Sequence, residues 1–268
     1  MKIRLLGTGA ADGIPAFTMD SEVSRHARQV GGKEIRSRCG ALIDDVLKLD
    51  LPPDTLAQCQ RDRVDPGLWT GLVFSHSHDD HFAPREIQYF VYPFNEREFT
   101  PFTIYGNAAI CSRLNEIYPE WPIELVETRS FQCFRHGDHS VTPIRANHKL
   151  DEDSHNLIVQ GEGKTFLYGT DTGVWEEPTW AYLSDFRLDG LVLECTEGFH
   201  GTGYAGHLDI YSFFHVIDRL RKQGTVHDGT FIATTHHSAL GQATHAQLES
   251  VLRPHGIEPG FDGMVIEL

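Results

Sequence analysis

The sequence predicts an α/β sandwich, in which two β-sheets pack face to face and helices cover their outer faces. Short apolar runs bounded by Gly, Pro or polar residues are typical of strands, and they recur through both halves of the 268-residue chain. Segments with apolar residues at helical spacing lie between them. No low-complexity stretch, long linker or internal repeat interrupts this pattern. We therefore expect a single domain over residues 1–268.

The elements of the first half follow from these signals in order. An apolar run at residues 3–6 ends in Gly7-Thr8-Gly9, which predicts a strand that breaks into a loop. Further strands are expected at residues 41–43, 46–51, 72–74 and 102–105. Pro52-Pro53 ends one of these strands, and Asp54 is the expected N-cap of a helix over residues 54–61. Two more helices are expected at residues 84–90, where a Pro occupies the first turn, and at 108–118.

The second half begins with a hairpin and continues with strands and helices. Residues 157–159 and 165–168 flank Gly161-Glu162-Gly163, which predicts two antiparallel strands joined by a short turn. Strands are expected at residues 191–193, 231–233 and 264–266. Apolar residues at helical spacing predict helices over residues 210–220 and 246–252. Strands in both halves, with helices interspersed, favour two sheets covered by helices.

The composition excludes several classes of protein. Hydrophobic residues make up 40% of the chain, which opposes disorder, and no apolar stretch reaches the roughly 18 residues of a membrane span. The N-terminus turns polar and Gly-rich too early for a secretory signal, so we expect a cytoplasmic protein. The 23 basic and 38 acidic residues give a net charge of −15, which argues against a nucleic-acid partner. Five scattered Cys argue against a disulfide framework, whereas 16 His point to metal.

The strongest functional signal is a cluster of imidazoles and carboxylates directly after the strand expected at 72–74. Residues 76–81 read His-Ser-His-Asp-Asp-His. In an extended or turning segment, His76 and His78 point to the same side and can chelate one ion, while Asp80 and His81 can reach a second. This donor set suits zinc, manganese or iron better than calcium. We therefore expect two divalent transition-metal ions as cofactors.

One cluster cannot complete two metal sites, so further ligands must come from the ends of other strands. His148, Asp171 and His236 each stand where an apolar run gives way to a loop. Because all three repeat the design of a strand that delivers a ligand at its tip, we expect them to join the cluster. His237 is an alternative to His236, which is favoured because it follows two Thr residues at the strand end.

These residues resemble the motif series of the metallo-β-lactamase-fold hydrolases, which is H-x-H-x-D-H, a distant His, a bridging Asp and a final His. The resemblance extends over the whole chain toward the PhnP-like phosphodiesterases. It rests there on residues 6–16, on Gly206-His207-Leu208-Asp209, on Thr235-His236 and on residues 260–264. The resemblance implies an αββα sandwich of two mixed sheets flanked by helices. It also implies hydrolysis of a small, cyclic phosphodiester such as phosphoribosyl cyclic phosphate.

The sequence departs from that family at one place. Its members commonly carry a Cys cluster after the opening loop, which holds a structural zinc together with a His that follows the last ligand. Here residues 17–24 contain no Cys, and Ala239 stands about where that His would be. We therefore expect no structural zinc, and the departure bears on the identity of the substrate.

The resemblance also assigns roles to the site residues. His76, His78 and His148 would hold one ion, Asp80, His81 and His236 the other, and Asp171 would bridge them. A hydroxide shared by the two ions would attack a small anionic phosphodiester, so that Asp80 counts both as a ligand and as a catalytic residue. His207 is the candidate general acid for the leaving oxygen, and Asp209 is a candidate for orienting it.

Other functions stay open at this point. A thioester or lactam hydrolase would use the same metals. Processing of tRNA 3′ ends is supported by similar ligands in a related family but opposed by the charge of −15. A non-catalytic metabolite carrier or sensor predicts degraded ligands, whereas this set looks intact. Arg36 and Arg38 are candidates for a phosphate clamp. A homodimer is one alternative for the oligomeric state.

Overall fold

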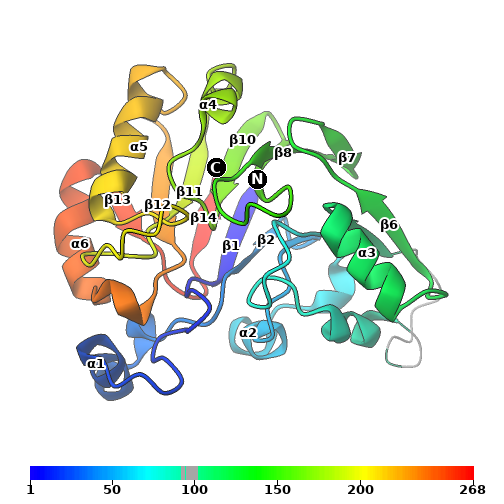
Figure 1. Cartoon of the computed structure of the whole chain (residues 1–268), viewed down its shortest axis with the longest axis horizontal. Coiled ribbons are helices and arrows are strands. Elements are labelled where there is room, and N and C mark those ends of the chain that lie inside the picture. The colour runs from blue at the N-terminus through cyan, green and yellow to red at the C-terminus, as the bar shows by residue number, and fades with distance from the viewer. Residues whose placement is uncertain (92–93, 95–101) are drawn as a thin grey trace.

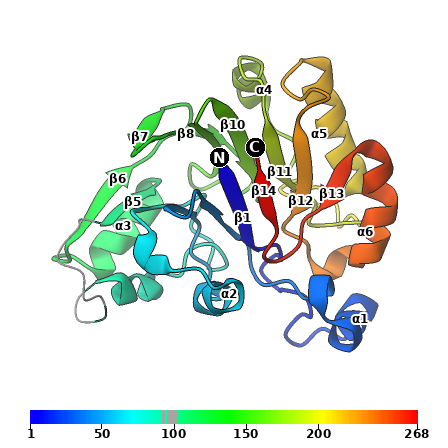
Figure 2. The same ribbon diagram turned by 180° about the vertical axis from the view of Figure 1, so that it is seen from behind.

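Two seven-stranded sheets pack against each other in the computed structural model (Figure 1). The structure describes residues 1–91, 94 and 102–268. The first sheet contains, in spatial order, β14 (Val265–Glu267), β1 (Lys2–Gly7), β2 (Gly40–Ile43), β3 (Leu47–Leu49), β4 (Gly71–Val73), β5 (Phe102–Gly106) and β6 (Ile123–Glu127). The second contains β13 (Ile257–Pro259), β12 (Phe231–Thr235), β11 (Gly190–Glu194), β10 (Lys164–Gly169), β9 (His155–Gly161), β8 (His139–Arg145) and β7 (Phe134–His136). The first and last strands of the chain pair with each other, with Lys2 opposite Glu267 (Figure 2).

Both sheets are mixed, with an antiparallel part and a parallel part. In the first sheet β14, β1, β2 and β3 pair antiparallel, and β3 to β6 pair parallel. In the second sheet β7 to β10 pair antiparallel, and β10 to β13 pair parallel. The carboxyl ends of parallel strands lie at one edge of a sheet, and such edges commonly carry the functional residues of α/β proteins.

The described part of the chain contains six α-helices, of which all but α1 cover the outer faces of the sheets (Figure 1). They are α1 (Glu22–Val30), α2 (Thr55–Asp62), α3 (Ala108–Ile117), α4 (Glu177–Leu183), α5 (Ile210–Lys222) and α6 (His245–Leu252). The outer face of the first sheet packs on α2 and α3, and that of the second on α4, α5 and α6. A further hydrophobic cluster lies between the sheets, where Leu49 and Val73 of the first sheet pack with Phe166 and Val192 of the second. The expected αββα sandwich is confirmed.

The parallel strands are buried on both faces, which explains their sequences. In β11, Leu191 and Leu193 pack against the helices, whereas Val192 between them packs between the sheets. All three have no exposed surface. A strand that is covered on both sides therefore reads as a continuous apolar run rather than as an alternating one.

Every strand and helix expected from the sequence is present, with ends shifted by at most two residues, but two details differ. Residues Pro84–Phe90 form a 3₁₀-helix rather than an α-helix. Asp54 stands at the N-cap of α2 without capping it, because its carboxylate instead accepts hydrogen bonds from the backbone and guanidinium of Arg38. The elements α1, α4, β6, β7 and β13 were not expected. In the described residues, no helix is long and apolar enough to cross a bilayer.

Residues 17–24, where the resemblance would have placed a Cys cluster, lie in a small apolar unit. Val23 and Ala27 of α1 pack with Ile14, Ala16 and Ala239, all of which are at most 3% exposed. Ala239 therefore lies in an apolar contact with α1, and its amide donates to the Asp12 carboxylate at 3.0 Å.

Candidate metal centre

The turn from His76 to His81 begins directly after β4, as its sequence predicted. The amides of His81 and Phe82 both donate to the carbonyl of His78, at 3.0 and 2.8 Å, which folds the turn back on itself. The carboxylate of Glu152 accepts from the amide and hydroxyl of Ser77, at 2.9 and 3.0 Å. This arrangement fixes the turn from two sides, so that its imidazoles are held before any ligand binds.

The first cluster contains His76, His78, His148 and Asp171, whose ligand atoms all lie within 4.8 Å of one another. The Nδ1 atom of His78 lies 3.0 Å from Nε2 of both His76 and His148. The Oδ2 atom of Asp171 lies 3.6 Å from Nε2 of His76 and 3.4 Å from Nε2 of His148. Three imidazole nitrogens and a carboxylate oxygen thus converge on one point.

The second cluster contains Asp80, His81, His236 and again Asp171, within the same limit of 4.8 Å. The Oδ1 atom of Asp171 lies 3.0 Å from Nε2 of His81 and 2.9 Å from Nε2 of His236. The Oδ2 atom of Asp80 lies 3.3 and 3.5 Å from the same two nitrogens. The structure therefore brings all seven predicted residues together, and the two oxygens of Asp171 face different clusters.

Two of these residues have a strained backbone. Asp171 and His236 follow β10 and β12 with φ angles of 42° and 55°, which lie in the left-handed region that residues other than Gly seldom adopt. The surrounding structure must hold this conformation, and such strain is frequent at functional sites. The bend turns each side chain from the strand end into the shared space.

A buried carboxylate that the sequence reading missed, Asp50, supports both clusters from behind. It accepts from Nδ1 of His81 at 2.8 Å and from the Ser75 hydroxyl at 2.9 Å, and that hydroxyl lies 3.0 Å from Nδ1 of His76. The fully buried ammonium of Lys48 donates to the Asp50 carbonyl, and burial lowers the pKa of Lys48 to about 8. With Nδ1 protonated in this way, Nε2 of both imidazoles is left free for a metal.

Replacing Asp50 with Asn is expected to weaken metal binding by roughly 10–100-fold, because the outer partner of two ligands loses its charge and one acceptor. The measurement is a chelator competition on the purified chain. Asp45→Asn, on a half-exposed carboxylate near the start of β3, is the control and should leave the affinity unchanged. Equal affinities of D50N and the parent chain, with D50N folded by circular dichroism, would contradict the role.

A second buried carboxylate, Glu194 at the end of β11, supports the opposite side. It accepts from Nδ1 of His207 at 2.7 Å and from the Thr196 hydroxyl, which in turn lies 2.8 Å from Nδ1 of His236. The backbone amides of Thr172, Thr196 and Leu208 also donate to it, at 2.7, 3.1 and 3.0 Å. These bonds occupy Glu194, so we assign it to orienting His207 and His236 rather than to a metal.

Charge in the site explains the pKa directions. Burial lowers the pKa of His76 well below its usual value. Burial acts in the same direction on His81 and His236, but the negatively charged groups around them, Asp171 foremost, together outweigh it and raise the pKa of both well above the ordinary value. Conversely, burial acts to raise the pKa of Asp171, yet these imidazoles hold it well below its usual range. The negative charge of Asp171 thus favours positive charge beside it, which fits a cation site.

His237 lies apart from the clusters, although it is also buried. Its Nε2 atom is 3.0 Å from the Thr234 hydroxyl, and its amide donates to the carbonyl of Thr8 at 2.9 Å. Of the two neighbouring imidazoles, the geometry therefore favours His236 as the ligand. We expect His236→Gln to lower the metal content from two ions per chain toward one and His237→Gln to retain both. Plasma mass spectrometry of the dialysed proteins measures this, and the reverse pattern would make His237 the ligand.

Three further expectations are corrected by the contacts. Asp209 does not orient His207, because its carboxylate caps α5 by accepting from the Ser212 amide at 2.7 Å. Arg36 is buried and donates to the Thr8 hydroxyl and the Gly260 carbonyl. Arg38 donates to the Ala11 carbonyl and pairs with Asp54. Neither guanidinium lines the cavity above the clusters, so a phosphate clamp by these residues is not supported.

A cavity of about 420 Å³ opens above both clusters, which is a usual size for a small-molecule site. It is lined by His207 and by five of the predicted ligands, which are His78, Asp80, His148, Asp171 and His236. His207 is mostly buried, and its ring centroid lies 4.8 Å from that of His148 and 5.4 Å from that of His236. Burial acts to lower its pKa, but Glu194 outweighs this and raises it.

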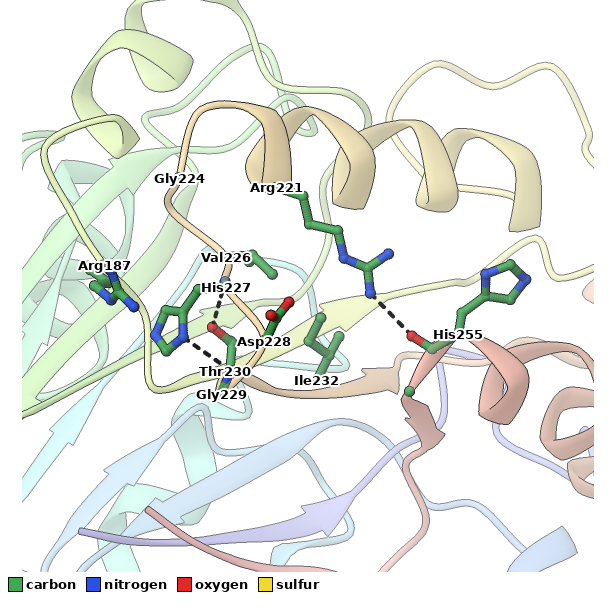
Figure 3. Close-up of a pocket in the computed structure, with 11 residues that line it drawn as sticks. Arg187, Arg221, Gly224, Val226, His227, Asp228, Gly229, Thr230, Ile232 and His255 are labelled. Atoms are coloured by element: carbon green, nitrogen blue, oxygen red, sulfur yellow. Dashed lines mark hydrogen bonds between the residues drawn. The ribbon is translucent and has the colours of Figure 1, made fainter.

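A second cavity, of about 730 Å³, lies at the other end of β12 (Figure 3). Figure 3 shows Arg221 of α5 donating to the backbone carbonyl of His255, and the His227 ring beside Thr230. The cavity includes residues from the turn before β12, whereas His236 follows the end of that strand. None of the seven predicted ligands lines it. The larger cavity is therefore separate from the chemistry described above.

Comparison with known proteins places this geometry in context. A family model described as the beta-lactamase superfamily domain matches residues 42–227. The chain is similar to Zn²⁺-bound PqqB from Methylobacterium extorquens, with 16% identity, a TM-score of 0.76 and 100% of both chains covered. It is similar to a diphosphatase from the PhnP family, with 20% identity, a TM-score of 0.75 and 100% and 97% of the two chains covered. It is also similar to the short form of human tRNase Z, with 18% identity, a TM-score of 0.67 and 100% and 99% of the two chains covered.

At these identities the structural likenesses show a shared fold and nothing finer. No curated protein sequence matches the chain. The metallo-β-lactamase-like sandwich expected from the motifs is thereby confirmed, and the clusters lie within it as a candidate metal site.

Proposed function

The chain belongs to the beta-lactamase superfamily, and from this premise we propose that it is a metal-dependent hydrolase of small phosphodiesters, cyclic ones included. The observation that carries the proposal is the convergence of five imidazoles and two carboxylates below an open cavity, with one carboxylate shared between two clusters. Five imidazoles and two carboxylates suit zinc or manganese, with iron as a third candidate.

The donor set fits two ions. His76, His78 and His148 would hold one, Asp80, His81 and His236 the other, and Asp171 would contribute an oxygen to each. Hydrogen bonds from Nδ1 of His76, His81, His148 and His236 leave Nε2 of each free to coordinate. Two bound ions would supply Lewis acidity toward the phosphoryl oxygens and lower the pKa of water toward neutrality.

His207 supplies the proton that the leaving group needs. Its Nδ1 atom is held by Glu194, which leaves Nε2 for the substrate in the cavity. As the bond between phosphorus and the leaving oxygen breaks, Nε2 donates its proton to that oxygen, and the imidazole regains a proton from water. Glu194 stabilises the protonated ring, so the pKa of His207 is raised although burial acts to lower it.

No specific contact favours the competing functions. A thioester or lactam hydrolase would use the same donors, so the distinction is experimental. Processing of tRNA requires a basic surface, and the net charge of −15 opposes it. A carrier without catalysis would not need His207 held by a buried carboxylate over the cavity.

The test combines metal analysis with a substrate panel. The purified chain is loaded with zinc or manganese, its metal content is measured, and it is assayed with bis-p-nitrophenyl phosphate, ribose cyclic phosphates, a thioester and a lactam. We expect two ions per chain and hydrolysis of the phosphodiesters. Fewer than two ions after loading, or cleavage of the thioester or lactam without any phosphodiester, would overturn the proposal.

A further inference from the structure

The upper part of the cavity has a chemistry that the metal ligands do not explain. Beside the ligands, its walls contain Asp12, Glu197, Tyr204 and Leu240. Among the described residues that line the cavity, there is neither a Lys nor an Arg. The walls away from the metal clusters are therefore acidic and apolar, which is unfavourable for a second anionic group on a ligand.

Both carboxylates are fixed in place by hydrogen bonds from the protein. Glu197 is 7% exposed and accepts from the amide of Thr202 at 2.7 Å and from its hydroxyl. Asp12 accepts from the Ser238 hydroxyl at 2.9 Å and from the Ala239 amide at 3.0 Å. No cation in the described structure pairs with either carboxylate, so neither charge is neutralised by an ion pair.

Tyr204 presents an aromatic ring at the rim. It is 51% exposed, and its ring centroid lies 5.5 Å from that of His207 and 6.3 Å from that of His148. Its position requires Gly206, where an added Cβ would lie only 2.6 Å from the Tyr204 ring. Leu240, which is 50% exposed, adds an apolar side chain to the same cavity. Partly exposed aromatic rings beside a reactive centre are suited to stacking with a planar ligand group.

From this wall chemistry we propose that the substrate is a phosphodiester with one negative charge whose alcohol carries a planar ring, and that a further phosphate group is disfavoured. The inference rests on the proposed function and narrows it. Two divalent ions would bring four positive charges, and the cavity walls already contain four carboxylates, those of Asp12, Asp80, Asp171 and Glu197. Asp80 and Asp171 belong to the metal clusters, so the two ions retain two positive charges for the single charge of a diester, whereas a second phosphate would face Asp12 and Glu197 without compensation. A phosphoribosyl cyclic phosphate, which has such a group, fits less well than its dephosphorylated counterpart.

The test compares two substrates with the same scissile bond, adenosine 2′,3′-cyclic phosphate and the same compound with an added 5′-phosphate. With the metal-loaded chain, we expect kcat/KM to be at least about tenfold higher for the compound without the 5′-phosphate. Equal or faster turnover of the 5′-phosphorylated compound would overturn the inference. Failure to cleave these and bis-p-nitrophenyl phosphate would overturn the proposed function instead.

A binding measurement gives a readout that does not depend on turnover. Calorimetric titration with adenosine 3′-phosphate and adenosine 3′,5′-bisphosphate should show weaker binding of the bisphosphate. Asp12→Asn retains an oxygen acceptor for Ser238 and Ala239 but removes the negative charge. It should reduce the ratio of the two dissociation constants by at least about threefold. Asp228→Asn, in the separate cavity of Figure 3, is the matched control and should leave the ratio of the two dissociation constants unchanged. Tighter binding of the bisphosphate, or equal effects of the two variants, would contradict the role of the acidic wall.

The ring is tested separately. Tyr204→Ala should raise KM for adenosine 2′,3′-cyclic phosphate by roughly threefold or more with little change in kcat, because stacking contributes to binding rather than to bond cleavage. Glycerol 1,2-cyclic phosphate, which has no planar ring, serves as the comparison substrate. An equal rise in KM for both substrates would show that Tyr204 only shapes the cavity and would overturn the preference for a ring.

Discussion

Asp171→Asn is expected to abolish both metal binding and hydrolysis, with the largest effect of any single substitution. Among the described residues, Asp171 alone is shared by the cluster of His76 and the cluster of His81, and each of its oxygens faces a different one. An amide offers only one oxygen and no charge. The loss of turnover should therefore exceed the roughly 10–100-fold that removing an outer partner costs.

The measurement is metal content by plasma mass spectrometry together with kcat/KM for bis-p-nitrophenyl phosphate. The control is Asp185→Asn, which removes an exposed carboxylate after α4 and should change neither quantity. Near-parental metal content and activity in D171N would show that the two clusters are not a dinuclear centre. Circular dichroism separates this outcome from loss of the fold.

His207→Ala is expected to lower kcat by about 10²–10⁴-fold for a diester with an alkoxide leaving group, because the leaving oxygen loses its proton donor. For a p-nitrophenolate leaving group, which is stable without a proton, the loss should be far smaller. This difference distinguishes a general acid from a residue that only shapes the cavity. His200→Ala, on an exposed imidazole of the same loop, is the control and should retain activity on both substrates.

Metal content provides the second arm of this experiment. His207 is not a predicted ligand, so the H207A protein should bind as many ions as the parent chain. Equal losses with both leaving groups at full metal content would remove the acid role, and loss of an ion would make His207 a ligand.

The ligand set could be predicted from the sequence because each member carries a local signal. The spacing within residues 76–81 is rarely met by chance, and His148, Asp171 and His236 each follow an apolar run. The convergence itself required the mixed sheets. Parallel pairing aligns the ends of β10, β11 and β12, which places Asp171, Glu194 and His236 along one edge.

The supporting carboxylates were missed although a usable signal was present. Asp50 and Glu194 each stand at the end of an apolar strand, reading Leu-Lys-Leu-Asp and Leu-Val-Leu-Glu. A carboxylate in that position is expected to be buried, and a buried carboxylate needs partners. The partners themselves, His81 and His207, could be identified only from the three-dimensional structure.

The elements that were not expected have weak patterns for physical reasons. In α1, Val23 and Ala27 are the buried apolar positions of a helix otherwise rich in charged and polar residues, so the helical period is barely visible. Its start is marked by Ser21, which caps it by accepting from the Ser24 amide. The strands β6 and β7 lie at the sheet edges and are only partly buried, which removes the continuous apolar run of the inner strands.

The pairing of the first and last strands has a consequence for how the protein is made. The carboxylate of Asp262 accepts from the amide and hydroxyl of Thr8, which is 254 residues away in the chain, and β14 completes the sheet beside β1. An emerging polypeptide cannot form these contacts until synthesis has passed Asp262 and β14. The edge of β1 thus remains unprotected on the ribosome, and this step is where we expect nascent chains to depend most on chaperones.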